Sequence, residues 1–216
     1  MLVIFDVEGV LFDAEYLPLL AEKINKEDEI WEITKKGIQG TINWEEGLHT
    51  RVNALKGMDF DICEKVANSL PIMTGAKEAC RILKAAGWKL MAISGGFSIM
   101  TKRLQKELDL DYVFSNELIF KEGKLDDVII SVDSDKAKSA MLKITEWEEN
   151  KEDIVVVVDG ANDIALFDIC GLGIAFRAQD KVKDLASVIL EEKDLSRILG
   201  IINKHFNLTL ESPTLA

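Results

Sequence analysis

The segment VIFDVEGVL, residues 3–11, shows the pattern from which the fold is predicted: a short apolar run leads directly into two acids, Asp6 and Glu8. Two later segments are built in the same way: KLMAI at 89–93 and IVVVV at 154–158 are short apolar runs that end in a polar residue followed by glycine. Runs this short, the last of them wholly β-branched, are typical of buried strands rather than helices. The sequence therefore predicts three core strands.

The polar residues that follow these strands are Asp6, Ser94 and Asp159. Helical patterns follow the second and third strands, and this alternation indicates a doubly wound, Rossmann-like parallel sheet. In such α/β sheets ligands bind beyond the carboxyl ends of the strands. We therefore expect an α/β fold with its site at these three residues.

The core is expected to be interrupted by an insertion. Between residues 13 and 72 the apolar residues keep helical spacing and strand-like runs are absent, which predicts a small α-helical cap. Residues 1–12 and 73–216 would form the α/β core, with a short core strand and a hairpin turning at 122–124. The last six residues, 211–216, are predicted to be a loose tail.

Composition narrows the class of function. The 216 residues are 48% hydrophobic and 30% charged, as in ordinary globular proteins, with a formal net charge of −12. The absence of a basic stripe argues against a nucleic-acid partner. A phosphorylated substrate could approach this acidic chain only with the help of a bound divalent cation or of a few Lys or Arg side chains at the site. The cysteines, Cys63, Cys80 and Cys170, are too widely spaced to predict a disulfide framework or a zinc site. We expect a cytoplasmic protein with reduced cysteines, no signal peptide and no membrane contact.

Two acidic pairs are candidate magnesium ligands. Asp6 and Glu8 lie at the mouth of the predicted sheet, and hard carboxylate oxygens suit Mg²⁺, which binds one or two of them together with substrate phosphate. Asp159 and Asp163 in DGANDIALF are the second pair. The alternatives are a solvated acidic loop for the first pair and helix capping by Asn162 or Asp163 for the second. Capping does not account for Asp159, an acid that follows four valines directly.

Two further motifs are suited to a phosphate group. In SGGF, Ser94 offers a hydroxyl, while Gly95 lets backbone N–H groups approach an anion, although a serine before two glycines is also common in plain turns. In DKAKSAML, Lys136 and Lys138 are both candidate cations, and the spacing alone does not choose between them.

These segments match, in order and separation, the motifs of the haloacid dehalogenase superfamily of phosphohydrolases. Within it the chain most resembles phosphoserine phosphatases, through ISGGF, AKSAML, DGANDIALF and, in the helical insertion, GTINWEEGLHTRV. The resemblance extends over nearly the whole chain. It also selects Lys138 over Lys136.

The resemblance implies a chemical role for each motif. Asp6 would be the nucleophile that forms an aspartyl-phosphate, and Glu8 would be the general acid and base. Mg²⁺ would be held by Asp6, the backbone carbonyl of Glu8 and Asp159, with Asp163 orienting this metal shell. The phosphate-binding residues implied by the family motifs are Ser94, Gly95, Lys138 and Asn162.

The resemblance also implies a substrate, O-phospho-L-serine, hydrolysed to serine and phosphate. Glu15 falls where phosphoserine phosphatases keep a glutamate that meets the substrate ammonium. Arg51 falls where they keep an arginine that grips the substrate carboxylate, a task suited to its forked donors. Family members are often monomers or dimers, so a monomer or a homodimer is expected.

The first motif departs from the family pattern DxDxT, since the chain reads DVEGV. Glu8 is one methylene longer than the aspartate of the family, and Val158 replaces a glycine common before the metal-binding aspartate. The form DxEGV also resembles phosphoserine:homoserine phosphotransferases. Phosphotransfer, hydrolysis of another small phosphorylated metabolite and catalytically silent ligand binding are therefore alternative hypotheses. A receiver module is disfavoured because receivers have no helical insertion after the phosphorylated aspartate.

Overall fold

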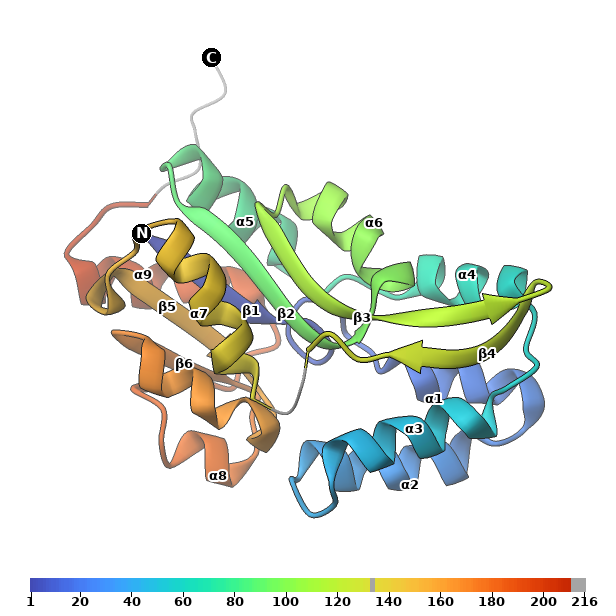
Figure 1. Ribbon diagram of the computed structural model, residues 1–216. Helices are drawn as coiled ribbons and strands as arrows, with labels where there is room; N and C mark the ends of the chain where they lie inside the picture. Colours follow the sequence, from blue (N-terminus) through green and yellow to red (C-terminus); the bar gives the residue numbers. More distant parts are fainter. Residues whose placement is uncertain (133–134, 211–216) are drawn as a thin grey trace.

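The computed structural model describes residues 1–132 and 135–210, and its centre is a sheet that runs through the whole molecule (Figure 1). Within those residues the sheet has seven strands in the order β4-β3-β2-β1-β5-β6-β7. Its strands are β1 (Leu2–Asp6), β2 (Lys89–Phe97), β3 (Tyr112–Lys121), β4 (Lys124–Ile129), β5 (Ile154–Val158), β6 (Leu172–Phe176) and β7 (Val188–Leu190). All pairings are parallel except β3 with β4, which confirms the predicted α/β fold.

The sheet is covered on both faces, which is why its central strands are apolar throughout. Along β1 the side chains alternate between two core clusters, with Val3 and Phe5 in one and Leu2 and Ile4 in the other. The helices outside the cap segment are α5 (Ala76–Ala85), α6 (Ser98–Leu108), α7 (Lys136–Glu146), α8 (Asp180–Lys183) and α9 (Ile198–Phe206), with the 3₁₀ segments η2 (Lys151–Asp153), η3 (Ala161–Ile169) and η4 (Leu195–Arg197).

The segment between β1 and α5 is helical, as the apolar spacing predicts. Its elements are α1 (Tyr16–Ala21), η1 (Glu22–Ile24), α2 (Glu27–Ile38), α3 (Trp44–Ala54) and α4 (Phe60–Ser69). The two chain segments that lead into and out of it run side by side: the Asp13 N–H donates to the carbonyl of Pro71, and the Met73 N–H donates to that of Leu11. The structure thus brings the entrance and the exit of this helical segment together.

The hairpin turn predicted at 122–124 is confirmed, because β3 and β4 are joined there by two residues with positive φ, Glu122 (51°) and Gly123 (75°). One difference is that the short core strand and the first arm of the hairpin are a single strand. The residues of β3 up to Asn116 pair with β2, and those from Glu117 onward pair with β4. The hairpin therefore extends from the core over the helical segment (Figure 1).

Backbone hydrogen bonds tie this hairpin to the chain between α3 and α4. The Gly57 N–H donates to the carbonyl of Leu125 at 2.7 Å, and the Phe60 N–H donates to that of Gly123 at 2.8 Å. The helical segment is thus held at its two ends and also along the hairpin.

The cysteines, the membrane-spanning potential of the helices and the predicted tail complete the comparison with the sequence. The three cysteines are buried and free, so no disulfide is formed. In the described ranges, no helix combines the length and the apolar character needed to cross a membrane. The tail predicted at 211–216 is not among the described residues.

Candidate active site

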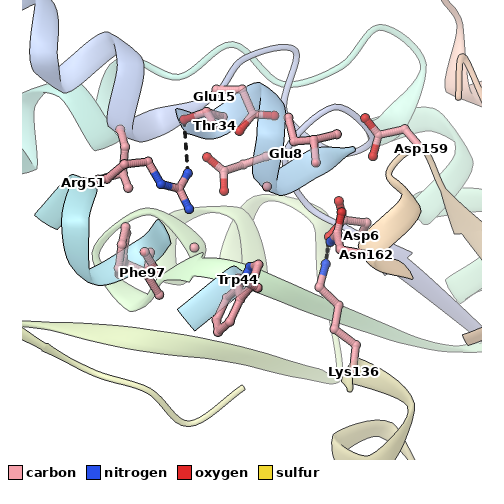
Figure 2. Close-up of a pocket in the computed structure, with 16 residues that line it drawn as sticks. Asp6, Glu8, Glu15, Thr34, Trp44, Arg51, Phe97, Lys136, Asp159 and Asn162 are labelled. Carbon is pink, nitrogen blue, oxygen red and sulfur yellow. Dashed lines mark hydrogen bonds and ion pairs between the residues drawn. The ribbon is translucent and has the colours of Figure 1, made fainter. Parts of the chain in front are cut away.

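A cavity lies where the carboxyl ends of β1, β2 and β5 meet the helical segment (Figure 2). It is lined by residues at the sheet edge and by residues of the helical segment, namely Asp6, Glu8, Glu15, Leu17, Thr34, Gly37, Ile38, Trp44, Leu48, Arg51, Gly95, Gly96, Phe97, Lys136, Asp159 and Asn162. Of the predicted site residues, three do not line it. Ser94 and Asp163 are buried behind its wall, and Lys138 is exposed to solvent.

The innermost contact of the cavity is an ion-pair chain. The Lys136 ammonium lies 2.6 Å from Asp6 Oδ1 and 2.6 Å from Asp163 Oδ1. Burial opposes the charged form of Lys136, but the carboxylates of Asp163 and Asp6 outweigh it and raise its pKa far above the ordinary value. Lys136 is therefore a fixed positive charge beside the predicted nucleophile.

This geometry corrects the selection of Lys138. Lys136 is the first residue of α7, where its side chain points to the sheet edge, as Figure 2 shows. Two residues further on the helix has turned by about 200°, so Lys138 points outward. The Lys138 backbone N–H instead donates to the Asp135 side chain at 3.3 Å, which caps the helix.

Three carboxylates converge at the sheet edge and could hold a metal ion. Oxygens of Asp6, Asp159 and Asp163 lie within 4.8 Å of one another. One oxygen of the innermost acid, Asp163 Oδ2, is buried with no hydrogen-bond partner. Since a buried, unpartnered carboxylate oxygen is costly, this donor set fits a hard divalent cation with its waters.

Burial and neighbouring charges shift the pKa of both Asp163 and Asp159 upward. Burial, followed by the charge of Asp6, raises the pKa of Asp163 to about 7. Burial and the charges of Asp6 and Asp163 raise the pKa of Asp159 well above its usual range. The cavity lining brings four carboxylates, but only two basic side chains, into one low-dielectric space. An added cation would therefore relieve the repulsion among the acids.

A close approach at Gly9 explains why the first motif contains glycine. Gly9 has φ +82°, and a Cβ built on it would lie 2.1 Å from Asp159 Oδ2. Left-handed backbone disfavours other residues, and here a side chain would also displace a candidate metal ligand. The turn after β1 therefore needs glycine at position 9 to leave room for Asp159, the acid that follows β5.

The Glu8 carboxylate is held at the start of α1. Its Oε1 accepts a hydrogen bond from the Tyr16 N–H at 2.7 Å, at the beginning of α1. Burial, opposed by this hydrogen bond and assisted by the charge of Asp6, raises the pKa of Glu8. A carboxyl group with a raised pKa is suited to donate a proton near neutral pH.

The SGGF motif lies at the end of β2, where the β3 pairing shifts register between Ile93 and Phe97. Ser94 Oγ accepts a hydrogen bond from the Gly96 N–H at 2.9 Å. The serine therefore fixes the backbone of the glycine loop and does not line the cavity. Gly95 does line it, as expected for a residue that approaches an anion.

A buried asparagine that the sequence analysis did not single out supports this loop. Asn116 is fully buried, and its amide donates to the carbonyl of Gly95 at 2.9 Å. Its Oδ1 accepts from the N–H groups of Ser131 and Val132, both at 2.9 Å. Asn116 therefore connects the glycine loop to the chain that leads towards α7.

Glu15 and Arg51, the residues predicted to select the substrate, lie together where the helical segment lines the cavity (Figure 2). Burial, then the charges of Glu8, Asp159 and Asp6, raise the pKa of Glu15 well above its ordinary value. Burial lowers the pKa of Arg51, while Glu8 and Glu15 counteract this shift. Asn162 also lines the cavity, and its amide donates to Asp163 Oδ1 at 3.1 Å.

Comparisons with known proteins agree with this geometry. The family model described as haloacid dehalogenase-like hydrolase matches residues 1–167. A phosphoserine phosphatase of Methanocaldococcus jannaschii is 39% identical over 204 residues, covering 93% of this chain and 97% of that protein. One of Archaeoglobus fulgidus is 36% identical, and this chain spans 59% of its length.

Solved structures show the same likeness. A phospho-aspartyl intermediate analogue of phosphoserine phosphatase has a TM-score of 0.88 and 37% identity, over 93% of this chain and 97% of that chain. A substrate-bound phosphoserine phosphatase complex has a TM-score of 0.88 and 36% identity over the same shares.

Proposed function

Because the chain belongs to the haloacid dehalogenase-like hydrolase family, we propose that it is a magnesium-dependent phosphatase that hydrolyses O-phospho-L-serine to serine and phosphate. The observation that carries this proposal is that one cavity joins Asp6, paired with Lys136, to Arg51 and Glu15 on the cap side. An anion at one end and a zwitterion at the other is the charge pattern of a phosphorylated amino acid. The names of the relatives and of the solved structures support the same substrate.

The first chemical step is attack by an Asp6 carboxylate oxygen on phosphorus. A bond forms between that oxygen and phosphorus while the bond from phosphorus to the serine oxygen breaks. Glu8, whose raised pKa favours the protonated form, gives its proton to the departing serine oxygen. Lys136 and the backbone at Gly95 stabilise the charge on the transferring group.

The second step returns the enzyme to its starting state. Glu8, now ionised, takes a proton from a water molecule whose oxygen attacks phosphorus, and the bond to Asp6 breaks. Inorganic phosphate leaves, Asp6 is a carboxylate again, and Glu8 is protonated again. Atoms and protons therefore balance over the cycle.

Mg²⁺ would be held by the carboxylates of Asp6 and Asp159, which lie near one another, and by the backbone carbonyl of Glu8. Asp163 would orient this metal shell. When bound, it supplies positive charge that offsets the repulsion between the phosphate group and these carboxylates. Residues 13–72 would act as the cap that carries Glu15 and Arg51 over the site.

Steady-state release of phosphate from phosphoserine with Mg²⁺ tests the proposal, with wild type, Asp6→Asn and Arg51→Ala side by side. Asp6→Asn should abolish turnover but still bind phosphoserine in calorimetry. Arg51→Ala should raise KM for phosphoserine but not for phosphoethanolamine, which has no carboxylate. Full activity of Asp6→Asn would overturn the mechanism, and formation of phosphohomoserine on addition of homoserine would favour phosphotransfer.

A further inference from the structure

The Arg51 guanidinium is held by two hydrogen bonds from different helices. Its Nε–H donates to the Gly47 carbonyl one turn earlier in α3, at 3.1 Å. Its Nη1 donates to Thr34 Oγ1 on α2, also at 3.1 Å. A guanidinium has five N–H groups in a rigid fork. Three of them therefore have no hydrogen-bond partner among the described residues and remain for a ligand.

Thr34 places a polar hydroxyl group on the buried face of α2. It is 1% exposed, and the other residues that α2 buries are Ile30 and Gly37. A buried hydroxyl is costly unless it is hydrogen-bonded, and the Thr34 hydroxyl accepts a hydrogen bond from Arg51 Nη1 (dashed line in Figure 2). Thr34 thus links the helix that lines the cavity to the helix that carries the arginine.

The hydroxyl also decides between competing partners of Arg51. The carboxylates of Glu8 and Glu15 both interact electrostatically with the guanidinium. Without the bond to Thr34, the freed Nη1 would turn towards these acids, since a charged hydrogen bond is stronger than a neutral one. Arg51 would then form an ion pair within the chain rather than bind a ligand.

We propose that Thr34 is a positioning residue that orients Arg51 towards the substrate carboxylate and so sets the preference of the site for phosphate monoesters that carry one. This inference rests on the proposed function, because it assigns the ligand of Arg51. Thr34 touches no reacting atom, so its effect is expected in KM for carboxylate-bearing substrates and not in the chemical step.

The test compares phosphoserine with phosphoethanolamine in variants of Thr34. Thr34→Val keeps the shape and removes the hydroxyl, and it should raise KM for phosphoserine about tenfold while kcat is retained. For phosphoethanolamine kcat/KM should stay within about twofold of wild type. Thr34→Ser restores the hydroxyl and should restore the preference for phosphoserine.

Two controls separate this role from general damage. Thr50→Val removes an exposed hydroxyl on α3, the helix that carries Arg51, where Thr50 Oγ1 donates to the Glu46 carbonyl. It should change KM for neither substrate. In an Arg51→Ala background, Thr34→Val should have no further effect on KM. If Thr34→Val is poorly folded by circular dichroism, Thr34→Ala serves as the second hydroxyl deletion.

The outcomes are distinguishable. If Thr34→Val lowers kcat/KM equally for both substrates, or changes it for neither, the role of Thr34 is overturned while the proposed function stands. If the wild type shows no preference for phosphoserine over phosphoethanolamine, the proposed function and this inference both fail.

Discussion

Asp6 Oδ1 and Lys136 Nζ lie 2.6 Å apart, joining residues 130 positions apart in the sequence. This pair brings the end of β1 to the start of α7, and the same ammonium also reaches Asp163 at 2.6 Å. A point charge held by two buried carboxylates is fixed before any substrate arrives.

Replacing Lys136 by Met should reduce kcat for phosphoserine about 10²- to 10³-fold, because a preorganised positive charge is lost from the phosphate site. Lys138→Met is the matched control, since it removes the same charge from the exposed side of the same helix. Steady-state phosphate release measures both. Comparable losses in the two variants would show that Lys136 has no special role.

Glu8→Gln should separate the two chemical steps on p-nitrophenyl phosphate. The p-nitrophenolate leaving group needs little protonation by an acid, so Asp6 should still be phosphorylated. The water that attacks the aspartyl-phosphate, in contrast, no longer has a general base. We expect a burst of p-nitrophenol close to one per active site, followed by turnover reduced about 10²- to 10⁴-fold, in rapid mixing. Asp6→Asn should give no burst. A steady rate without a burst in Glu8→Gln would contradict the proposed role.

Gly9→Ala should weaken the affinity for Mg²⁺, because a Cβ there would lie 2.1 Å from Asp159 Oδ2 and displace this ligand. Gly123→Ala is the control, since Gly123 also has positive φ (75°) but nothing lies within 4 Å of its Cβ position. Both variants should lose about 1–2 kcal/mol of unfolding free energy to backbone strain. Magnesium titrations of activity should shift only for Gly9→Ala, and an unchanged affinity would count against the contact.

Asn116→Asp should weaken phosphate binding. Aspartate can still accept from the Ser131 and Val132 N–H groups, but it cannot donate to the Gly95 carbonyl and faces it with like partial charge. We expect the inhibition constant of inorganic phosphate to rise about tenfold. Asn53→Asp adds the same charge at an exposed position and should leave that constant unchanged.

The stabilisation by Mg²⁺ should grow with pH. The pKa of Asp163 is raised to about 7 and that of Asp159 is raised as well, so the metal-free folded state holds protons that the unfolded chain has released. Its unfolding free energy therefore falls as pH rises from the ordinary carboxyl range towards about 7. Bound Mg²⁺ relieves this loss because it replaces those protons.

Thermal unfolding at about pH 5 and about pH 8, each in Mg²⁺ and in chelator, measures this effect. The Tm difference between Mg²⁺ and chelator should be larger at the higher pH. Asp163→Asn should reduce the pH dependence of that difference. The same difference at both pH values in the wild type would contradict a metal held by these acids.

Much of the fold and part of the site could be predicted from local sequence. Short apolar strands that end in polar residues and glycine are a local pattern, and parallel strands bring their carboxyl ends to one edge. Asp6, Gly95 and Asp159 are therefore found where the sequence predicts them, around one cavity. The helices of residues 13–72 and the turn at 122–124 follow from equally local signals.

The choice between Lys136 and Lys138 was wrong because it depends on helix phase. Both residues have the same neighbours in the sequence, but only the position of α7 against the sheet decides which one points inward. Thr34 and Asn116 were missed for a related reason. Each is one polar residue in a helix or strand, and nothing local shows that its partner is Arg51 or Gly95.

The α/β order of elements, the acids at the strand ends and the helical character of the insertion follow from the sequence alone, because they depend on periodicity and turn chemistry within a few residues. The packing of the elements was needed to show that Lys136 pairs with Asp6, that a Cβ at position 9 would clash with Asp159 and that Thr34 holds Arg51. These contacts join residues from different elements, and their geometry is set by how the elements pack, which no short stretch of sequence encodes.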